Sequence, residues 1–328
     1  MAVLITGGAG YIGSHTAAEL IDAGEETVII DNLQKGHKDA VLGGKLYIGD
    51  LRDDEFLDKV FRENDIMEVI HFAADSLVGE SMENPLKYYD NNVISTINLM
   101  KKMKQYNVKR IVFSSTAAVY GEPKSVPITE EHITNPTNTY GETKLAVEKA
   151  MQWVDKAYGI KFISLRYFNA SGAHPNGLIG EDHRPESHLI PLILKAALSK
   201  NPVINVFGDD YDTPDGTCIR DYIHVMDLAQ AHILALKKIR NNGKSSIYNL
   251  GNGKGFSVNE VIEIAREVTG VNIKAELTNR RSGDPAVLIA SSDKAREELN
   301  WIPKYDDLKT IIATAWEWHK NHPNGFGK

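Results

Sequence analysis

The sequence of 328 residues contains a single cysteine, Cys218. One cysteine cannot form an intramolecular disulfide, and Cys218 belongs to no Cys/His spacing that is typical of a zinc site. No apolar run approaches the roughly 18 residues that a membrane-spanning helix needs. A secretory signal is also missing, because residues 2–6 are typical of a strand that leads directly into a glycine-rich turn. These absences predict a protein of the reducing cytoplasm.

The sequence also has little excess of either charge. It contains 37 Lys and Arg against 44 Asp and Glu, which gives a formal charge of −7. Without a dense basic run, neither nucleic acid nor an anionic membrane is an expected partner. The hydrophobic share of 42% and the charged share of 25% are typical of a globular protein. We find no internal repeat or long linker, and the length exceeds that of a usual single domain, so we expect two lobes.

Short apolar runs alternate with amphipathic segments over the first 170 residues. We expect strands at residues 3–6, 27–30, 46–48, 69–72, 110–114 and 161–166. This alternation predicts an α/β fold with a Rossmann-type doubly wound parallel sheet, covered by helices on both faces. The ligand is then expected at the carboxyl ends of the strands.

After residue 172 the regular alternation of apolar runs and amphipathic segments ends. This change predicts a second, smaller α/β lobe that binds the substrate. We place the division at residues 1–175 and 176–328, with an approximate boundary and with lobes that are free to interleave. In the second lobe, Ser257 and Glu260 have the spacing of a capping box, which predicts that a helix begins there. Trp301, Trp316 and Trp318 are expected to pack the C-terminal helix onto the body.

Three glycines, Gly7, Gly10 and Gly13, lie between the first expected strand and the first helix. Such glycines permit a tight turn and let backbone N–H groups approach a pyrophosphate at the helix N-terminus. Asp31 ends the second expected strand about 20 residues after Gly10, where a carboxylate binds ribose hydroxyls and disfavours NADP relative to NAD. The alternative is a structural turn with an unrelated surface acid. Asp50, which follows the third strand, is a candidate for the adenine amino group or else a turn residue.

Tyr140 and Lys144 are spaced so that they share one face of a helix. A neighbouring ammonium and a positively charged nicotinamide both favour the phenolate, which makes Tyr140 a candidate base. Taken alone, this spacing arises by chance on many amphipathic helices. Thr116 lies just after the strand expected at 110–114, where a hydroxyl partner is needed, although hydroxyls at strand ends are ordinarily turn groups. The combination with the glycine motif favours the catalytic interpretation.

These motifs resemble the extended short-chain dehydrogenase/reductase superfamily, and within it the UDP-glucose 4-epimerase family, over essentially the whole chain. The matching runs lie at residues 7–16, 71–74, 88–92, 114–121, 140–144, 166–172, 207–225, 248–251 and 280–284. The stretches 209–225 and 280–284 are the most characteristic, because generic dehydrogenases lack them.

The resemblance implies the cofactor and the roles of individual residues. NAD would bind to Gly7, Gly10, Tyr11, Ile12, Gly13, Asp31, Asn32, Asp50, Leu51, Phe72, Ala73, Ala74, Asn91, Tyr140, Lys144, Tyr167 and Phe168. The catalytic set would be Thr116, Tyr140 and Lys144. A UDP-hexose would contact Thr116, Tyr140, Asn169, His188, Leu189, Arg220, Tyr222, Arg281, Asp284 and Leu288. The planar guanidinium groups of Arg220 and Arg281 suit a diphosphate, although solvated surface arginines are the alternative.

The implied activity is the interconversion of UDP-glucose and UDP-galactose in galactose metabolism. Tyr140 would take the proton of the sugar 4′-hydroxyl while NAD accepts the C4 hydride, giving enzyme-bound NADH and a transient 4-keto sugar. The sugar would turn and receive the hydride on its other face, so the reaction has no net redox change. The resemblance also implies a homodimer through the helices expected near residues 93–103 and 145–158, although the apolar stripes of these segments fit equally well against the parent sheet.

Three positions depart from some members of the family. Ser76 stands where others carry a lysine near the cofactor phosphates, so NAD is expected to be more exchangeable. His188 replaces an asparagine, which leaves one substrate contact open. Leu288 replaces a bulky tyrosine, and the smaller side chain would admit an N-acetyl group, so that UDP-GlcNAc and UDP-GalNAc become substrates. The alternative is that Leu288 is ordinary core.

Two other classes of protein fit part of the sequence. A nucleotide-sugar dehydratase needs an Asp–Glu pair directly after the strand-end threonine, but Ala117 and Ala118 follow Thr116 here. A regulatory protein that senses NAD would need the glycine turn but neither Tyr140 nor Lys144.

Glu181, Asp182, His183, Glu186 and His188 are ligand-type residues whose spacing fits neither one helix face nor one strand face. We therefore expect a polar loop there and no metal.

Overall fold

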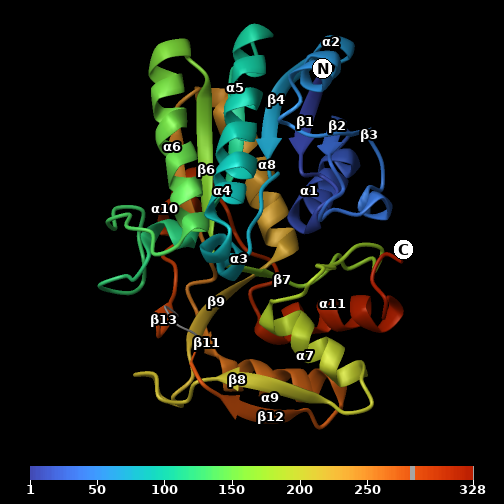
Figure 1. The fold of residues 1–328 in the computed structure, drawn as a ribbon, viewed down its shortest axis with the longest axis vertical. Helices are drawn as coiled ribbons and strands as arrows, with labels where there is room; N and C mark the ends of the chain where they lie inside the picture. Colours follow the sequence, from blue (N-terminus) through green and yellow to red (C-terminus); the bar gives the residue numbers. More distant parts are fainter. Residues whose placement is uncertain (281–284, 328) are drawn as a thin grey trace.

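The computed structural model describes residues 1–280 and 285–327. Its upper part in Figure 1 contains a seven-stranded sheet in the order β10-β6-β5-β4-β1-β2-β3, and all neighbouring strands are parallel. The strands are β1 (Ala2–Thr6), β2 (Glu26–Asp31), β3 (Lys45–Ile48), β4 (Ile66–His71), β5 (Arg110–Thr116), β6 (Lys161–Tyr167) and β10 (Ser246–Leu250). The predicted Rossmann-type α/β fold is therefore confirmed, and all six strands expected from the first 170 residues are present with small shifts at their ends.

Alternation along each strand divides the core into two layers, because successive side chains point to opposite faces of a sheet. Val3 and Ile5 pack with α1 (Tyr11–Asp22), α8 (Val225–Asn242) and α10 (Asp293–Leu299). Ala2 and Leu4 pack on the other face with α2 (Asp54–Glu63), α5 (Ser95–Gln105) and α6 (Thr139–Tyr158). Since helices cover both faces, the inner strands are largely buried, and their carboxyl ends are the natural place for a ligand.

Short helices connect the strands near these carboxyl ends. They are η1 (Lys38–Ala40), α3 (Val78–Glu83), α4 (Pro85–Tyr88), η2 (Tyr89–Ile94) and η3 (Ala117–Tyr120). Within residues 1–280 and 285–327, none of the helices combines the length and the apolar character needed to span a membrane.

A second core lies in the lower part of Figure 1. It is formed by α7 (Leu189–Leu198), β8 (Val203–Phe207), α9 (Val258–Thr269) and α11 (Leu308–Asn321), and the exposed strand β12 (Lys274–Thr278) pairs with β8. The helix predicted at Ser257 is present: the Ser257 hydroxyl accepts from the Glu260 N–H at 3.1 Å, and the Glu260 carboxylate accepts from the Ser257 N–H at 2.7 Å. Trp318 on α11 is fully buried, as is Trp301 on the sheet side.

Four short strands join the two parts: β7 (Asn169–Ser171), β9 (Ile219–His224), β11 (Gly255–Ser257) and β13 (Val287–Leu288). The chain also returns to the upper part after residue 175, because α8 covers the seven-stranded sheet and β10 is its edge strand. We propose that the cofactor-binding unit is residues 1–175 together with α8, β10 and α10, and that the remaining chain forms the substrate-binding unit.

Candidate active site

A cavity of about 1120 Å³ lies at the carboxyl ends of the parallel strands and extends toward the second core. Within the described chain, every residue that the sequence assigned to the cofactor, the substrate or catalysis lines this one cavity. Arg281 and Asp284 lie outside the described residues. The fold therefore gathers residues from opposite ends of the chain, and their individual roles stay predictions.

The glycine turn forms a cradle that side chains would fill. Gly7 has φ +72°, and a Cβ there would lie 2.6 Å from the Ala73 nitrogen. A Cβ on Gly13 would lie 2.1 Å from the Gly7 carbonyl oxygen. Gly10 precedes α1 and no described side chain caps that helix, so its first N–H groups remain for an anion. This geometry fits the pyrophosphate of a dinucleotide.

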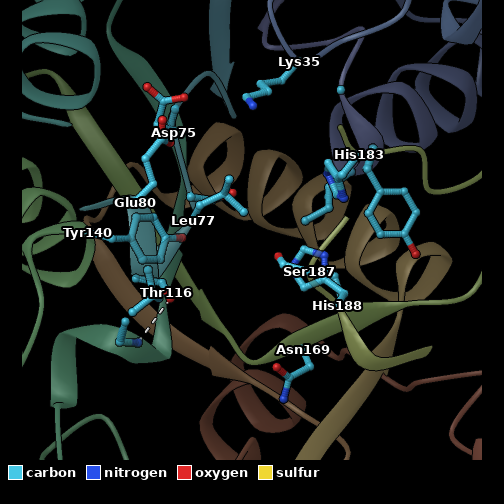
Figure 2. A pocket seen from close by; sticks show the side chains of 18 of the residues that line it. Lys35, Asp75, Leu77, Glu80, Thr116, Tyr140, Asn169, His183, Ser187 and His188 are labelled. Atoms are coloured by element: carbon cyan, nitrogen blue, oxygen red, sulfur yellow. Dashed lines mark hydrogen bonds between the residues drawn. The ribbon is translucent and has the colours of Figure 1, made fainter. Parts of the chain in front are cut away.

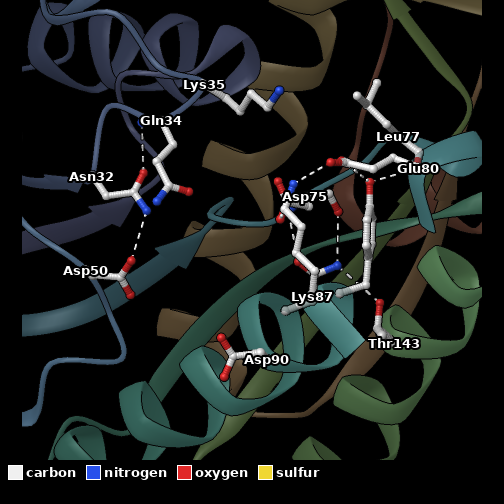
Figure 3. Close-up of polar contacts among 12 residues, drawn as sticks. Asn32, Gln34, Lys35, Asp50, Asp75, Leu77, Glu80, Lys87, Asp90 and Thr143 are labelled. Carbon is white, nitrogen blue, oxygen red and sulfur yellow. Dashed lines mark hydrogen bonds and ion pairs between the residues drawn. The ribbon is translucent and has the colours of Figure 1, made fainter. Parts of the chain in front are cut away.

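Carboxylates and amides line the cavity beyond this turn. Asp31 accepts hydrogen bonds from the Ala9 N–H at 3.0 Å and from the Leu33 N–H at 2.9 Å. Burial raises the pKa of Asp31, and the two backbone hydrogen bonds oppose that rise. Asn32 donates to Asp50 at 3.1 Å (Figure 3). Asp31 at the tip of β2 thus has the location predicted for a ribose contact.

Asp50 is part of an ion-pair chain that the sequence did not reveal. The Arg52 guanidinium lies 2.7 Å from one Asp50 oxygen and 2.5 Å from Asp90. These hydrogen bonds with Arg52 hold the pKa of Asp50 well below its usual range. Asp50 therefore stays ionised at neutral pH, which suits a role as acceptor for an amino group.

Lys35 is a second residue that the sequence analysis missed. Its side chain points into the cavity, and its ammonium donates to the Arg184 carbonyl at 3.1 Å (Figures 2 and 3). Burial raises the pKa of Asp75, and the charge of Lys35 is among those that oppose this rise. The hydrogen bond with Lys87 lowers the pKa of Glu80, and the charge of Lys35 adds to that fall. Lys35 therefore faces the segment that contains Ser76. The cavity thus has a cation near Ser76, where the resemblance implied a lysine in other members of the family.

The catalytic candidates come from the end of β5 and the start of α6. The Asn138 side chain accepts from the Gly141 N–H at 2.9 Å and so begins α6 just before Tyr140. Removal from water raises the pKa of Tyr140 to about 12, although its hydrogen bond with Thr116 opposes this. The Thr116 hydroxyl also accepts from the Ala118 N–H at 3.1 Å, which fixes it at the cavity (Figure 2).

Lys144 lies beneath Tyr140 on the same helix face, as predicted. Its ammonium is 5.9 Å from the centre of the Tyr140 ring and donates to the Ser114 carbonyl at 2.8 Å. Burial lowers the pKa of Lys144 to about 7, while the nearby Glu148 carboxylate opposes this fall. In the protein without a bound cofactor, burial therefore keeps the Tyr140 phenol protonated at neutral pH.

A buried ion pair supports these residues from behind. Arg166 donates to both oxygens of Glu148, at 3.0 and 2.5 Å, and both side chains are almost fully buried. The Ser115 hydroxyl donates to Glu148 at 2.6 Å, and Arg166 also donates to the Tyr120 hydroxyl at 2.9 Å. This network joins β5, β6 and α6, which together carry the catalytic candidates.

The substrate side of the cavity is formed by β7, β9 and β13. Asn169 donates to the Asp221 carbonyl at 3.1 Å, and Tyr222 is buried on β9. Arg220 donates to the Ile219 carbonyl at 2.9 Å. Leu288 pairs with Arg220 across β13 and β9, lines the cavity, and packs against the small apolar cluster around Val119. Leu288 thus belongs to both the core and the cavity wall.

The segment 181–188 contains neither helix nor strand, as the predicted polar loop requires, but four of its side chains gather in one place. Ligand-type atoms of Glu181, His183, Glu186 and His188 all lie within 4.8 Å of one another. The reason is local: the Glu186 carboxylate accepts from the backbone N–H groups of Ser187 and His188, which turns the chain back on itself. Burial alone would lower the pKa of His183, but the two carboxylates raise it to about 9.

The fold and the cavity together define a nucleotide-binding enzyme of the Rossmann type. The model of the NAD dependent epimerase/dehydratase family matches residues 3–251, and the chain belongs to this family. The predicted membership of the epimerase group is confirmed, and so is NAD as the cofactor.

Individual relatives narrow this class. A UDP-glucose 4-epimerase of Halalkalibacterium halodurans is 60% identical over 99% of this chain and 98% of its own length. A solved UDP-glucose 4-epimerase structure is 58% identical, with a TM-score of 0.98 and full coverage of both chains. The Bifidobacterium longum UDP-glucose 4-epimerase, solved with NAD⁺ and UDP, is 43% identical with a TM-score of 0.94, over 99% of this chain and all of its own.

Proposed function

We propose that this enzyme interconverts UDP-glucose and UDP-galactose by inverting C4 of the sugar through a transient 4-keto sugar. The proposal rests on one observation. The glycine cradle, the hydrogen-bonded pair Thr116 and Tyr140, and Arg220 all line the same cavity. The volume of about 1120 Å³ exceeds that of a typical site for one small ligand, which favours two occupants side by side.

Proton transfer is the task that we assign to Tyr140. Its phenolic oxygen takes the proton of the sugar 4′-hydroxyl, and the Thr116 hydroxyl bridges or shortens this hydrogen bond. NAD, when bound, would supply the hydride acceptor and donor for C4 and a positive ring that favours the phenolate. Lys144 adds a second positive charge beneath the phenol and holds the nicotinamide ribose.

The uridine diphosphate supplies most of the binding energy in this proposal, because the sugar has to turn between the two halves of the reaction. Arg220 would bind the diphosphate through its planar fork, with Asn169 and Tyr222 beside it. A tightly held sugar ring would oppose the inversion, so few contacts are expected beyond Tyr140 and Thr116.

The two rival functions have less support. A dehydratase would need acidic groups after Thr116, where η3 instead carries Ala117 and Ala118. A protein that only senses NAD would have no use for the hydrogen bond between Thr116 and Tyr140 or for Lys144 beneath it.

We also propose that N-acetylated UDP-hexoses are accepted, because Leu288 leaves more room at the cavity wall than a tyrosine would. Leu288→Tyr is expected to lower turnover of UDP-N-acetylglucosamine at least about tenfold while turnover of UDP-galactose changes little. Leu288→Ile, which conserves volume, is the matched control. If the wild-type enzyme turns over UDP-galactose but not UDP-N-acetylglucosamine, this part of the proposal is wrong.

We further propose a homodimer that works in the cytoplasm in galactose metabolism. Support for the dimer comes from large apolar side chains that are exposed on neighbouring parts of the fold. Ile94 and Ile97 lie on η2 and α5, and Trp153 on α6 is 69% exposed. These positions belong to the two helical segments predicted for the dimer contact.

The test is to add UDP-galactose to the full-length enzyme with no added oxidant or reductant and to follow the sugar nucleotides by chromatography. UDP-glucose should accumulate until equilibrium is reached. Tyr140→Phe should reduce turnover by at least about 10²-fold and leave NAD bound, while Tyr106→Phe, a matched change on the outer end of α5, should have no effect. A dehydrated product, or no product at all, would contradict the proposed reaction.

A further inference from the structure

Two histidines and two glutamates of the segment before α7 form a compact cluster on the cavity wall. His183 and His188 lie across the view from Thr116 and Tyr140 in Figure 2. No step assigned to Tyr140 or Lys144 uses Glu181, His183 or Glu186. The question is therefore what this group of side chains binds.

The ligand-type atoms of the cluster lie close enough together to gather around one metal ion, although the two shortest separations are hydrogen-bond distances that would have to lengthen slightly. The Glu181 Oε1 atom lies 2.7 Å from His188 Nδ1 and 3.1 Å from His183 Nδ1. The Glu186 Oε1 atom lies 3.3 Å and 3.8 Å from the same two nitrogens. Ligands about 2.0–2.2 Å from a tetrahedral Zn²⁺ are separated by roughly 3.4 Å. Small movements of these side chains would therefore place the four ligand atoms around one ion.

A second observation concerns the other oxygen of Glu186. Oε2 is buried and has no hydrogen-bond partner in the described chain, and the Glu186 side chain is only 5% exposed. Lys195 is 3.7 Å away, which is an ion-pair distance but not a hydrogen bond. A buried carboxylate oxygen without a donor is costly, and the Lys195 ammonium offsets this cost only through its charge.

The ligand types select among metals. Mg²⁺ and Ca²⁺ prefer sites made entirely of oxygen atoms, whereas imidazole nitrogen suits Zn²⁺ and other transition metals. Two carboxylates also balance the two positive charges of such an ion, so the buried site becomes neutral when the histidines are unprotonated. These features favour a closed site with two nitrogen and two oxygen ligands.

We propose that Glu181, His183, Glu186 and His188 bind one Zn²⁺ ion. The ion would fix the segment 181–188 as the wall between the glycine cradle and α7, and it would take no part in proton transfer. Ligation through Nδ1 of His188 leaves its Nε2 atom for the cavity, where His188 was predicted to contact the substrate. This inference stands on the cluster alone and does not rest on the proposed reaction.

The test measures metal content and affinity rather than activity. The full-length enzyme is stripped with a chelator, dialysed and titrated with Zn²⁺ alone by calorimetry, with elemental analysis of the product. One Zn²⁺ per chain is expected. His183→Gln and Glu186→Gln should each weaken binding at least ~100-fold, because loss of a direct ligand costs more than loss of a supporting contact. His174→Gln, a histidine that pairs with the single carboxylate of Glu19, is the matched control and should bind Zn²⁺ like the wild type.

A spectroscopic readout keeps the proposal testable if the variants fail to fold. Wild-type enzyme reloaded with Co²⁺ should show the intense visible absorption of a tetrahedral site, and Zn²⁺ should abolish it by displacement. The proposal is overturned if the stripped wild-type enzyme takes up no Zn²⁺ and no Co²⁺. It is equally overturned if folded His183→Gln and Glu186→Gln variants retain wild-type affinity.

Discussion

Replacing Glu148 by glutamine tests whether the buried ion pair behind the site supports both stability and chemistry. Glu148→Gln preserves the size of the side chain and leaves an oxygen that can accept from Ser115. It removes the charge that faces Arg166, whose guanidinium is bound to both carboxylate oxygens. The perturbation is therefore almost purely electrostatic.

The expected cost follows from the burial of both partners. Removing one member of a buried pair typically costs about 3–5 kcal/mol, because the remaining charge is left in a poorly solvating environment. Since the new amide would keep part of the hydrogen bonding, we expect a value near the lower end, about 3 kcal/mol. Glu317→Gln removes a similar charge from an exposed pair with Lys320 and should cost less than about 1 kcal/mol.

Urea unfolding, followed by fluorescence and by far-ultraviolet circular dichroism, measures this free energy. The double variant Glu148→Gln/Arg166→Met should be more stable than the sum of the single changes predicts, since no charge is then left unpaired. A Glu148→Gln protein within about 0.5 kcal/mol of the wild type would refute the reasoning.

The same substitution has a consequence for the pH profile. Glu148 opposes the fall in the pKa of Lys144, which is about 7 in the wild-type chain. Without the carboxylate this pKa falls further, so the Lys144 ammonium loses its proton at a lower pH. The high-pH limb of turnover should therefore move to lower pH in Glu148→Gln, and it should stay in place in Glu317→Gln.

Three further predictions concern the cofactor and the dimer. Gly13→Ala places a methyl group 2.1 Å from the Gly7 carbonyl oxygen, so the purified variant should carry at least about tenfold less NAD than the wild type. The control is Gly79→Ala, whose methyl group would have no heavy atom within 4 Å and which should carry the normal amount of NAD. Ser76→Lys should slow the exchange of NAD at least about tenfold, as measured by dilution into labelled NAD, and an unchanged rate would mean that Lys35 already supplies the needed charge. If the protein forms the proposed dimer, Trp153→Glu should convert it to a monomer in light scattering, and a wild-type monomer would contradict the proposed dimer.

Local features of the sequence predicted most of the sheet and the glycine cradle. The apolar runs in β1, β2, β4 and β5 reflect burial on both faces of the sheet, and this pattern is visible in the sequence. The helix start at Ser257 was also predictable, since a capping box depends on residues three apart. The proximity of Tyr140 and Lys144 was predictable in the same way, because residues four apart lie one helical turn apart on the same face.

Contacts between distant segments could not be predicted in this way. The pairing of β10 with β6 and the ion pair between Glu148 and Arg166 depend on how the whole chain packs. Lys35 reaches the cavity from the loop after β2, and nothing in its neighbours marked it. The His–Glu cluster could have been suspected from the alternation of its glutamates and histidines between residues 181 and 188, but neither helix nor strand periodicity would have joined them.

The fate of the hydrogen on C4 tests the central claim most directly. UDP-galactose carrying deuterium at C4 is incubated with the full-length enzyme, and the UDP-glucose formed is analysed by mass spectrometry and NMR. If oxidation and reduction occur at the same carbon within one turnover, the label should remain at C4 of the product. Loss of the label to solvent or to free NAD during steady conversion would contradict the account.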